Sequence, residues 1–159
     1  MQRIKHRNIV RFIDSFTEGD YLYLVMEYCD RGDLSMYLNR LDSMMIPESK
    51  LWKFFLQLLS SMSYIHNKSI IHGDLKPQNI LLHGRDYDAK LTDFGISQSM
   101  AGLNQQCFEA AGSLAYCSPE LLNGEPYNQK TDVWALGCIL YEMITKQCAF
   151  KGGNEQAII

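Results

Sequence analysis

The side chains best suited to chemistry are concentrated in one polar loop, residues 72–79 (HGDLKPQN), and one further carboxylate follows at Asp93. The polar loop carries a carboxylate at Asp74, an ammonium group at Lys76 and an amide at Asn79. An aspartate can accept the proton of an attacking hydroxyl, a lysine can offset charge on a moving phosphoryl group, and amide and carboxylate oxygens bind Mg²⁺. The set predicts phosphoryl transfer. Asp74, Lys76 and Asn79 would be the catalytic residues, and Asn79 and Asp93 would hold magnesium.

Each of these motifs or residues, taken alone, has an ordinary structural explanation. Asp-Phe-Gly is common in turns, where glycine supplies a positive φ, and a loop Asp or Asn usually forms a turn or caps a helix. The order of several motifs carries more weight. The polar loop is followed by Asp-Phe-Gly at 93–95, by Gly-Ser-x-x-Tyr-x-Ser-Pro-Glu at 112–120 and by Asp-Val-Trp-Ala-Leu-Gly at 132–137.

Composition and charge restrict the classes of function. The chain has 159 residues, is 47% hydrophobic and 21% charged, and carries a formal net charge of −3. These values are typical of one soluble domain, and without a basic run they argue against a nucleic acid partner. The five cysteines are odd in number and form no CxxC pair, so we expect reduced thiols in a cytosolic protein without a secretory leader. The longest apolar run, around 133–144, is too short and too interrupted to span a membrane.

The N-terminal part predicts a β-hairpin. Residues 1–6 look like the tail of a helix, and residues 8–16 and 21–28 alternate between apolar and polar side chains around a turn at 17–20. Without the later motifs this would be a plain hairpin of an α+β domain.

Two helices are expected next. Asp33 is a good N-cap for a short helix over 34–41, and Pro47 starts a long helix that ends near Asn67. The long helix carries one apolar stripe for the core, made of Leu51, Phe54, Phe55, Leu58, Met62 and Ile65.

Short apolar runs at 70–71, 80–82 and 89–92 predict strands on both sides of the polar loop. Such strands would give the loop a rigid frame, which matters because this chemistry depends mostly on positioning. Residues 95–118 have no periodicity, and a loop of that length in a compact domain is usually functional or disordered.

Asp132 opens the last predicted helix. Its carboxylate would either accept backbone N–H groups of the polar loop near His72 and Gly73 or act as a simple N-cap, and the sequence leaves both open. Apolar spacing makes this helix a central buried one, through Val133, Leu136, Ile139, Leu140 and Ile144.

Together these motifs resemble the catalytic half of a eukaryotic protein kinase of the serine/threonine type. Several phrases are similar to the NIMA-related (never-in-mitosis) family: LVMEYC at 24–29, YCSPE at 116–120, PYN at 126–128, WALGC at 134–138 and AFKGGN at 149–154. The resemblance implies a partial α+β protein-kinase-like fold over 1–159. Residues 1–28 would end the small lobe. Residues 29–159 would form a large lobe that is truncated after the start of the helix following the central buried helix.

The resemblance also implies ATP and Mg²⁺ as cofactors. Met26 would border the adenine pocket, backbone groups of Glu27 and Cys29 in the hinge would bond the adenine edge, and Leu81 would close the pocket from below. Asp33 would lie near the ribose, although capping explains it equally well. An internal spine of stacked side chains would link the two lobes through Phe12, His72 and Phe94.

Residues 95–118 would be the activation segment. Ser113 would bridge Asp74 and Lys76, and Tyr116 to Glu120 would form a shelf for the substrate chain. Glu120 would be buried without its usual arginine partner, so we expect this segment alone to be poorly stable and inactive.

Gly73 departs from the kinase pattern. Most regulated kinases have an arginine there, which receives an activation-loop phosphate. Residues 100–112 also contain no Ser, Thr or Tyr, and Glu109 occupies the usual phosphothreonine position. We therefore expect this loop not to be switched by phosphorylation at that site.

The expected function is transfer of the ATP γ-phosphate to serine or threonine hydroxyls of a protein substrate. The alternative is a pseudokinase or scaffold that acts through protein binding. Family analogy adds an association with the cytoskeleton, centrosome or flagellum, and the sequence does not indicate an oligomeric state.

Overall fold

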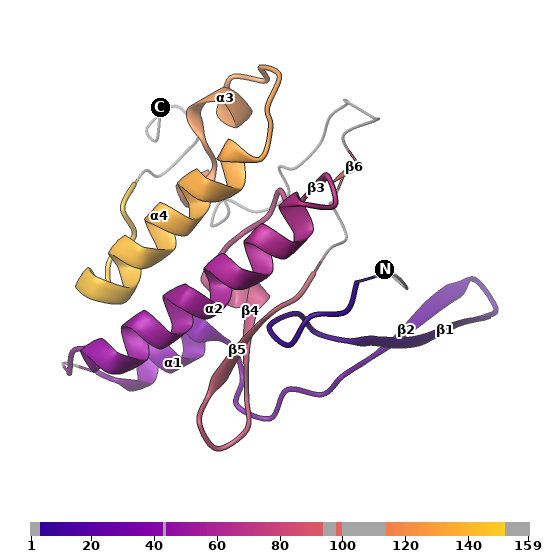
Figure 1. The fold of residues 1–159 in the computed structure, drawn as a ribbon, viewed down its shortest axis with the longest axis horizontal. Helices are drawn as coiled ribbons and strands as arrows, with labels where there is room; N and C mark the ends of the chain where they lie inside the picture. The colour runs from indigo at the N-terminus through magenta and orange to yellow at the C-terminus, as the bar shows by residue number, and fades with distance from the viewer. Residues whose placement is uncertain (1–3, 43, 94–97, 100–113, 152–159) are drawn as a thin grey trace.

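The computed structural model describes residues 4–42, 44–93, 98–99 and 114–151, and these residues form an α+β fold. Figure 1 shows a hairpin that projects from a mainly helical part, with the paired strands β4 and β5 between them. The elements in chain order are β1 (Phe12–Glu18), β2 (Tyr21–Met26), α1 (Leu34–Arg40), α2 (Glu48–His66), β3 (Ile70–Ile71), η1 (Pro77–Asn79), β4 (Ile80–His83), β5 (Asp88–Leu91), β6 (Gln98–Ser99), η3 (Leu114–Tyr116), α3 (Pro119–Leu122) and α4 (Lys130–Thr145).

The predicted hairpin is confirmed, but its bounds differ from the prediction. β1 and β2 pair in antiparallel fashion from Phe12 opposite Met26 to Glu18 opposite Tyr21. Residues 8–10 are not part of β1, because Val10 N–H donates to Leu91 O and Leu91 N–H donates to Asn8 O, both at 2.9 Å. The N-terminal segment therefore runs beside β5. The expected helix tail is wrong for residues 4–6, which have no regular structure.

The long helix α2 supplies most of the core, as its apolar stripe predicted. Five of the six stripe residues are buried and Phe55 is partly buried against them; the buried ones are Leu51, Phe54, Leu58, Met62 and Ile65. Full burial of such a side chain contributes about 1.5–3 kcal/mol. α2 packs against β5 and α4, so it lies directly behind the strands that flank the polar loop.

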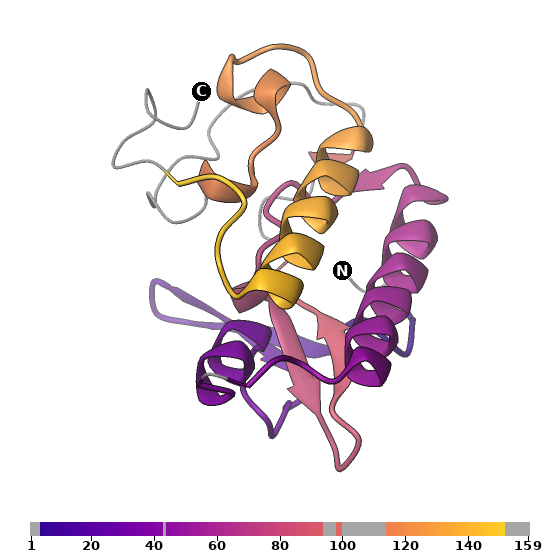
Figure 2. The same cartoon turned by 90° about the vertical axis from the view of Figure 1, so that its left-hand side faces the viewer.

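α4 is less buried than its apolar spacing predicted. Leu136 and Ile139 are buried, and Leu140 packs partly against the core. Val133 and Ile144 are exposed, so the prediction of a central buried helix is wrong for these two positions. Within the described part of the chain, α4 packs mainly against α2 and η3, and Figure 2 shows α2 and α4 side by side. Among the described residues, only one side of the helix is therefore covered.

The strands around the polar loop are confirmed. β4 pairs with β5 from Ile80 opposite Leu91 to His83 opposite Asp88, and Ile80, Leu82, Ala89 and Leu91 are buried. β3 immediately precedes the polar loop, and η1 ends it. No helix among the described residues has the length and apolarity needed to cross a bilayer.

Candidate active site

The polar loop brings three of the predicted catalytic side chains into direct contact. Lys76 Nζ donates to Asp74 Oδ2 at 2.7 Å, and Asn79 Nδ2 donates to the same oxygen at 3.0 Å and to the Asp74 carbonyl at 2.8 Å. The Asp74 carboxylate is mostly buried, with a side-chain exposure of 15%. A carboxylate held by an ammonium and an amide has a fixed orientation, which a proton acceptor requires.

Asn79 is presented by a short 3-10 turn. Pro77 occupies the first position of η1, where its missing N–H costs nothing, and the turn places Asn79 in a buried position next to β4. Because both donated bonds leave from Nδ2, the amide oxygen is the atom with which Asn79 could bind a cation.

Asp93 is connected to this group through its neighbour. Thr92 N–H donates to Asn79 O at 3.0 Å, so the chain entering Asp93 lies beside Asn79. Asp93 itself is exposed and has a left-handed backbone, with φ of 63°. The backbone that leads into the fourth predicted residue therefore lies next to Asn79.

His72 is a fully buried support for the polar loop. Its Nε2 lies 2.9 Å from Thr92 O, and its Nδ1 accepts the Asp74 N–H at 3.2 Å. A carbonyl can only accept, so Nε2 carries the hydrogen and the imidazole is neutral. Burial lowers the pKa of His72 below 6.5, while the Thr92 carbonyl and the charges of Asp132, Asp74 and Asp93 oppose this effect.

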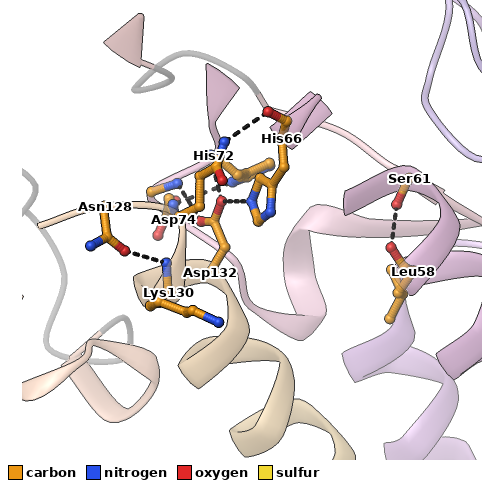
Figure 3. A network of polar contacts seen from close by, with 10 residues as sticks. Leu58, Ser61, His66, His72, Asp74, Asn128, Lys130 and Asp132 are labelled. Carbon is orange, nitrogen blue, oxygen red and sulfur yellow. Dashed lines mark hydrogen bonds and ion pairs between the residues drawn. The ribbon is translucent and has the colours of Figure 1, made fainter. Parts of the chain in front are cut away.

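Asp132 anchors the backbone of the polar loop from α4, as Figure 3 shows. It accepts the His72 N–H and the Gly73 N–H, each at 2.9 Å, and is 1% exposed. The N-cap position of α4 belongs to Gln129, so of the two contacts left open by the sequence the structure contains the one with the polar loop.

Sequence reasoning missed His66, at the end of α2. Its Nε2 donates to Asp132 Oδ2 at 2.8 Å, and its carbonyl accepts Gln129 Nε2 at 2.7 Å. The one feature of the sequence that could have indicated this role was a histidine at the end of the predicted long helix, a few residues before the polar loop. The contact itself joins positions 66 residues apart and could not be read from local spacing.

The structure brings some of the residues predicted to bind the nucleotide next to one another. Phe12, Met26 and Asp93 line the same surface hollow. Asp33 caps α1 by accepting the Met36 N–H at 2.7 Å, and it forms an isolated bridge with Leu81, which is half-buried. Cys29 is half-buried, and burial raises the pKa of its thiol, with a smaller contribution from the charge of Glu27.

The comparisons with known proteins agree with this arrangement. The model of the family described as "Protein kinase domain" matches residues 1–159, which is the entire chain.

The chain belongs to the protein kinase domain family.

Serine/threonine-protein kinase Nek5 of Homo sapiens is 40% identical over 159 residues, covering 100% of this chain and 22% of that protein. Serine/threonine-protein kinase nekl-2 of Caenorhabditis elegans is 40% identical over 166 residues, covering 100% of this chain and 46% of that protein. Serine/threonine-protein kinase ATG1b of Arabidopsis thaliana is 39% identical over 98% of this chain and 22% of that protein. The chain thus spans less than half the length of each of these kinases.

Tyr116, the first residue of the predicted shelf, is buried. Its hydroxyl donates to Glu142 Oε2 at 2.5 Å, and burial together with this carboxylate raises the pKa of the phenol. Tyr116 lines a small hollow together with Gly73 and Asp74. Glu120 was expected to be buried, but it is half-buried and accepts the Thr131 hydroxyl at 3.2 Å.

Two predicted residues, Phe94 and Ser113, lie outside the described residues, as does Glu109. The stacked spine through Phe12 and His72, and the bridge from Ser113 to Asp74 and Lys76, stay predictions.

The residues present fit magnesium held together with a nucleotide. Among the described residues no three His, Cys, Asp or Glu side chains gather into a group that could hold a metal alone. Mg²⁺ in kinases is bound by one or two side-chain oxygens together with substrate phosphates. The Asn79 amide oxygen and the exposed Asp93 carboxylate would supply the protein part of such a site.

Proposed function

We propose that the protein containing this chain transfers the γ-phosphoryl group of ATP to serine or threonine hydroxyls of protein substrates. The observation that carries the proposal is the hydrogen-bonded group of Asp74, Lys76 and Asn79. We further propose that residues 1–28 end the small lobe of the kinase domain and that 29–159 form its large lobe.

In the proposed reaction the acceptor hydroxyl approaches Asp74, whose carboxylate takes its proton. The hydroxyl oxygen bonds to the γ-phosphorus while the bond from that phosphorus to the β–γ bridging oxygen breaks, and ADP leaves. Lys76, 2.7 Å from Asp74, offsets charge on the transferring group. Magnesium, when bound, neutralises charge that develops between the phosphates, and Asn79 and Asp93 would hold it.

The remaining residues position this group. His72 keeps the Asp74 backbone in place through Nδ1, and Asp132 fixes the two residues before Asp74. Catalysis of phosphoryl transfer is largely positioning and charge stabilisation, so such supports bear directly on rate.

The test is phosphotransfer by the full-length protein with Mg-ATP and a mixture of protein substrates, followed by identification of the phosphorylated amino acids. Asp74→Asn keeps the shape but removes the proton acceptor, so we expect kcat to fall by about 10²–10⁴-fold. Asp14→Asn, an exposed carboxylate on β1, is the matched control and should leave kcat unchanged.

Nucleotide binding without transfer by the wild-type protein would contradict the proposal and favour the scaffold alternative. Phosphotyrosine as the main product would contradict the serine/threonine part of it.

A further inference from the structure

Lys90, in the middle of β5, makes a set of contacts unlike those of a surface lysine. Its side chain is 11% exposed. Its Nζ donates to Arg7 O at 2.9 Å and lies 3.0 and 3.1 Å from the two carboxylate oxygens of Glu27. A lysine ammonium has three N–H donors, and here three acceptors surround it.

Glu27 is held from two sides. It follows the last residue of β2, its N–H donates to Arg11 O at 2.8 Å, and its Oε2 accepts the Arg11 N–H at 3.2 Å. Burial alone would raise the pKa of Glu27, but the hydrogen bonds from Lys90 and from the Arg11 backbone outweigh it, so the pKa lies below its usual value. Glu27 is therefore charged at neutral pH and forms an ion pair with Lys90.

Three separate segments meet at this ion pair. The N-terminal segment is fastened to β5 by Asn8, whose Nδ2 donates to Ala89 O at 2.9 Å, and it contributes the Arg7 carbonyl to Lys90. The hinge contributes Glu27. β5 contributes Lys90 itself and continues through Thr92 to Asp93.

The position of Lys90 in the sheet points toward the nucleotide. Lys90 pairs with Leu81 across β4 and β5, and directly opposed residues in an antiparallel pair project from the same face. Leu81 is the residue expected to close the adenine pocket, and Glu27 supplies backbone expected to bond the adenine edge. The ion pair between Lys90 and Glu27 can therefore fix the distance between β4, which carries Leu81, and the hinge backbone that is expected to bond adenine.

We propose that Lys90 is a positioning residue for the nucleotide, which acts through Glu27 on the hinge backbone that bonds adenine. The inference rests on the proposed function, because it assumes that ATP binds along this edge. Loss of a partly buried, charged hydrogen bond should then weaken nucleotide binding by about tenfold.

The experiment uses Lys90→Met in the full-length protein, since methionine retains much of the apolar stem and removes the charge. We expect the Kd and the KM for ATP to rise by about tenfold while kcat changes by less than about twofold. Inorganic tripolyphosphate, which has no adenine, should bind both proteins equally. A purely structural role would lower the unfolding temperature without this selective effect on adenine.

Lys53→Met is the matched control. Lys53 also joins a backbone carbonyl and a carboxylate, Asp86 O at 2.7 Å and Asp88 Oδ1 at 3.0 Å, but it does so from α2 and away from the hinge. It should leave ATP affinity unchanged.

Glu27→Gln completes the test and also serves if Lys90→Met fails to fold. If Lys90 acts through Glu27, the double variant should bind ATP no more weakly than either single variant. If Lys90→Met or Glu27→Gln folds and binds ATP as tightly as the wild type or more tightly, the inference is overturned. It is also overturned if the increase in Kd of the double variant equals the product of the two single increases. Wild-type protein that neither binds ATP nor transfers phosphate would instead overturn the proposed function.

Discussion

At the residue scale, Gly73 is the position where the polar loop departs from the common kinase pattern. Its φ is +79°, in the left-handed region that glycine adopts without strain. A Cβ at this position would meet no atom within 4 Å. The backbone conformation, and not a lack of space, therefore favours glycine, and a side chain could be accommodated at the cost of backbone strain alone.

Gly73→Ala should lower the free energy of unfolding by about 1–2 kcal/mol, because an L-residue pays that much in the left-handed region. Gly137 is the matched control, since it is exposed inside α4, has no positive φ and also has open space around a Cβ. Gly137→Ala should raise the free energy of unfolding by about 0.5–1 kcal/mol. Urea unfolding of both variants measures the two effects, and changes of the same sign would contradict the explanation.

At the scale of elements, the polar loop depends on two helices that are distant in sequence. α4 supplies Asp132, and α2 ends at His66, which bonds the same carboxylate. β3 and β4 flank the loop, while Asp132 holds the backbone of its first two residues. The loop geometry is therefore a property of the packed helices and not of the loop sequence alone.

Asp132→Ala should remove this support. It leaves the buried N–H groups of His72 and Gly73 without their acceptor, which should lower the free energy of unfolding by about 3 kcal/mol. The kcat of the full-length protein should fall as well. Asp33→Ala removes an exposed cap bond to Met36 and should cost only about 1 kcal/mol. Urea titrations compare the two, and an equal cost would contradict the supporting role of Asp132.

The sequence predicted what depends on local spacing. The hairpin, the stripe on α2, the cap at Asp33 and the strands around the polar loop follow from periodicity and from turn and cap residues. It could not predict contacts between distant segments, such as His66 with Asp132 or Lys90 with Glu27. The prediction that Val133 is buried failed for the same reason, since apolar spacing cannot show which side of a helix is covered.

At the scale of the whole molecule, stability should depend on pH through His72, which is buried, and to a smaller extent through His6, which is partly buried. The pKa values of His72 and His6 both lie below 6.5, mainly because burial disfavours their charged forms. At pH values between the pKa of a histidine in the folded protein and its pKa in the unfolded chain, the unfolded chain binds more protons than the folded protein. The stabilisation is therefore complete above pH 6.5 and is lost as pH falls through the folded pKa.

Urea unfolding at a series of pH values from about 8 to about 5 should show this loss, before the carboxylates titrate. His6→Asn is the control, because His6 is only partly buried and the variant should retain most of the pH dependence. The imidazole signals of His72 in NMR should titrate below those of a model peptide. Stability that is constant or rises as the solution is acidified would contradict the prediction.

The clamp formed by His66 and Asp132 has a consequence for heat inactivation. In many enzymes a mobile active-site loop melts first and activity disappears while the rest of the protein is still folded. Here the backbone of His72 and Gly73 is bonded to a carboxylate of α4, and that carboxylate is bonded to His66 at the end of α2. We therefore expect the start of the loop to loosen together with the packing of the two helices. Loss of activity and cooperative melting of the helical core should therefore be a single event.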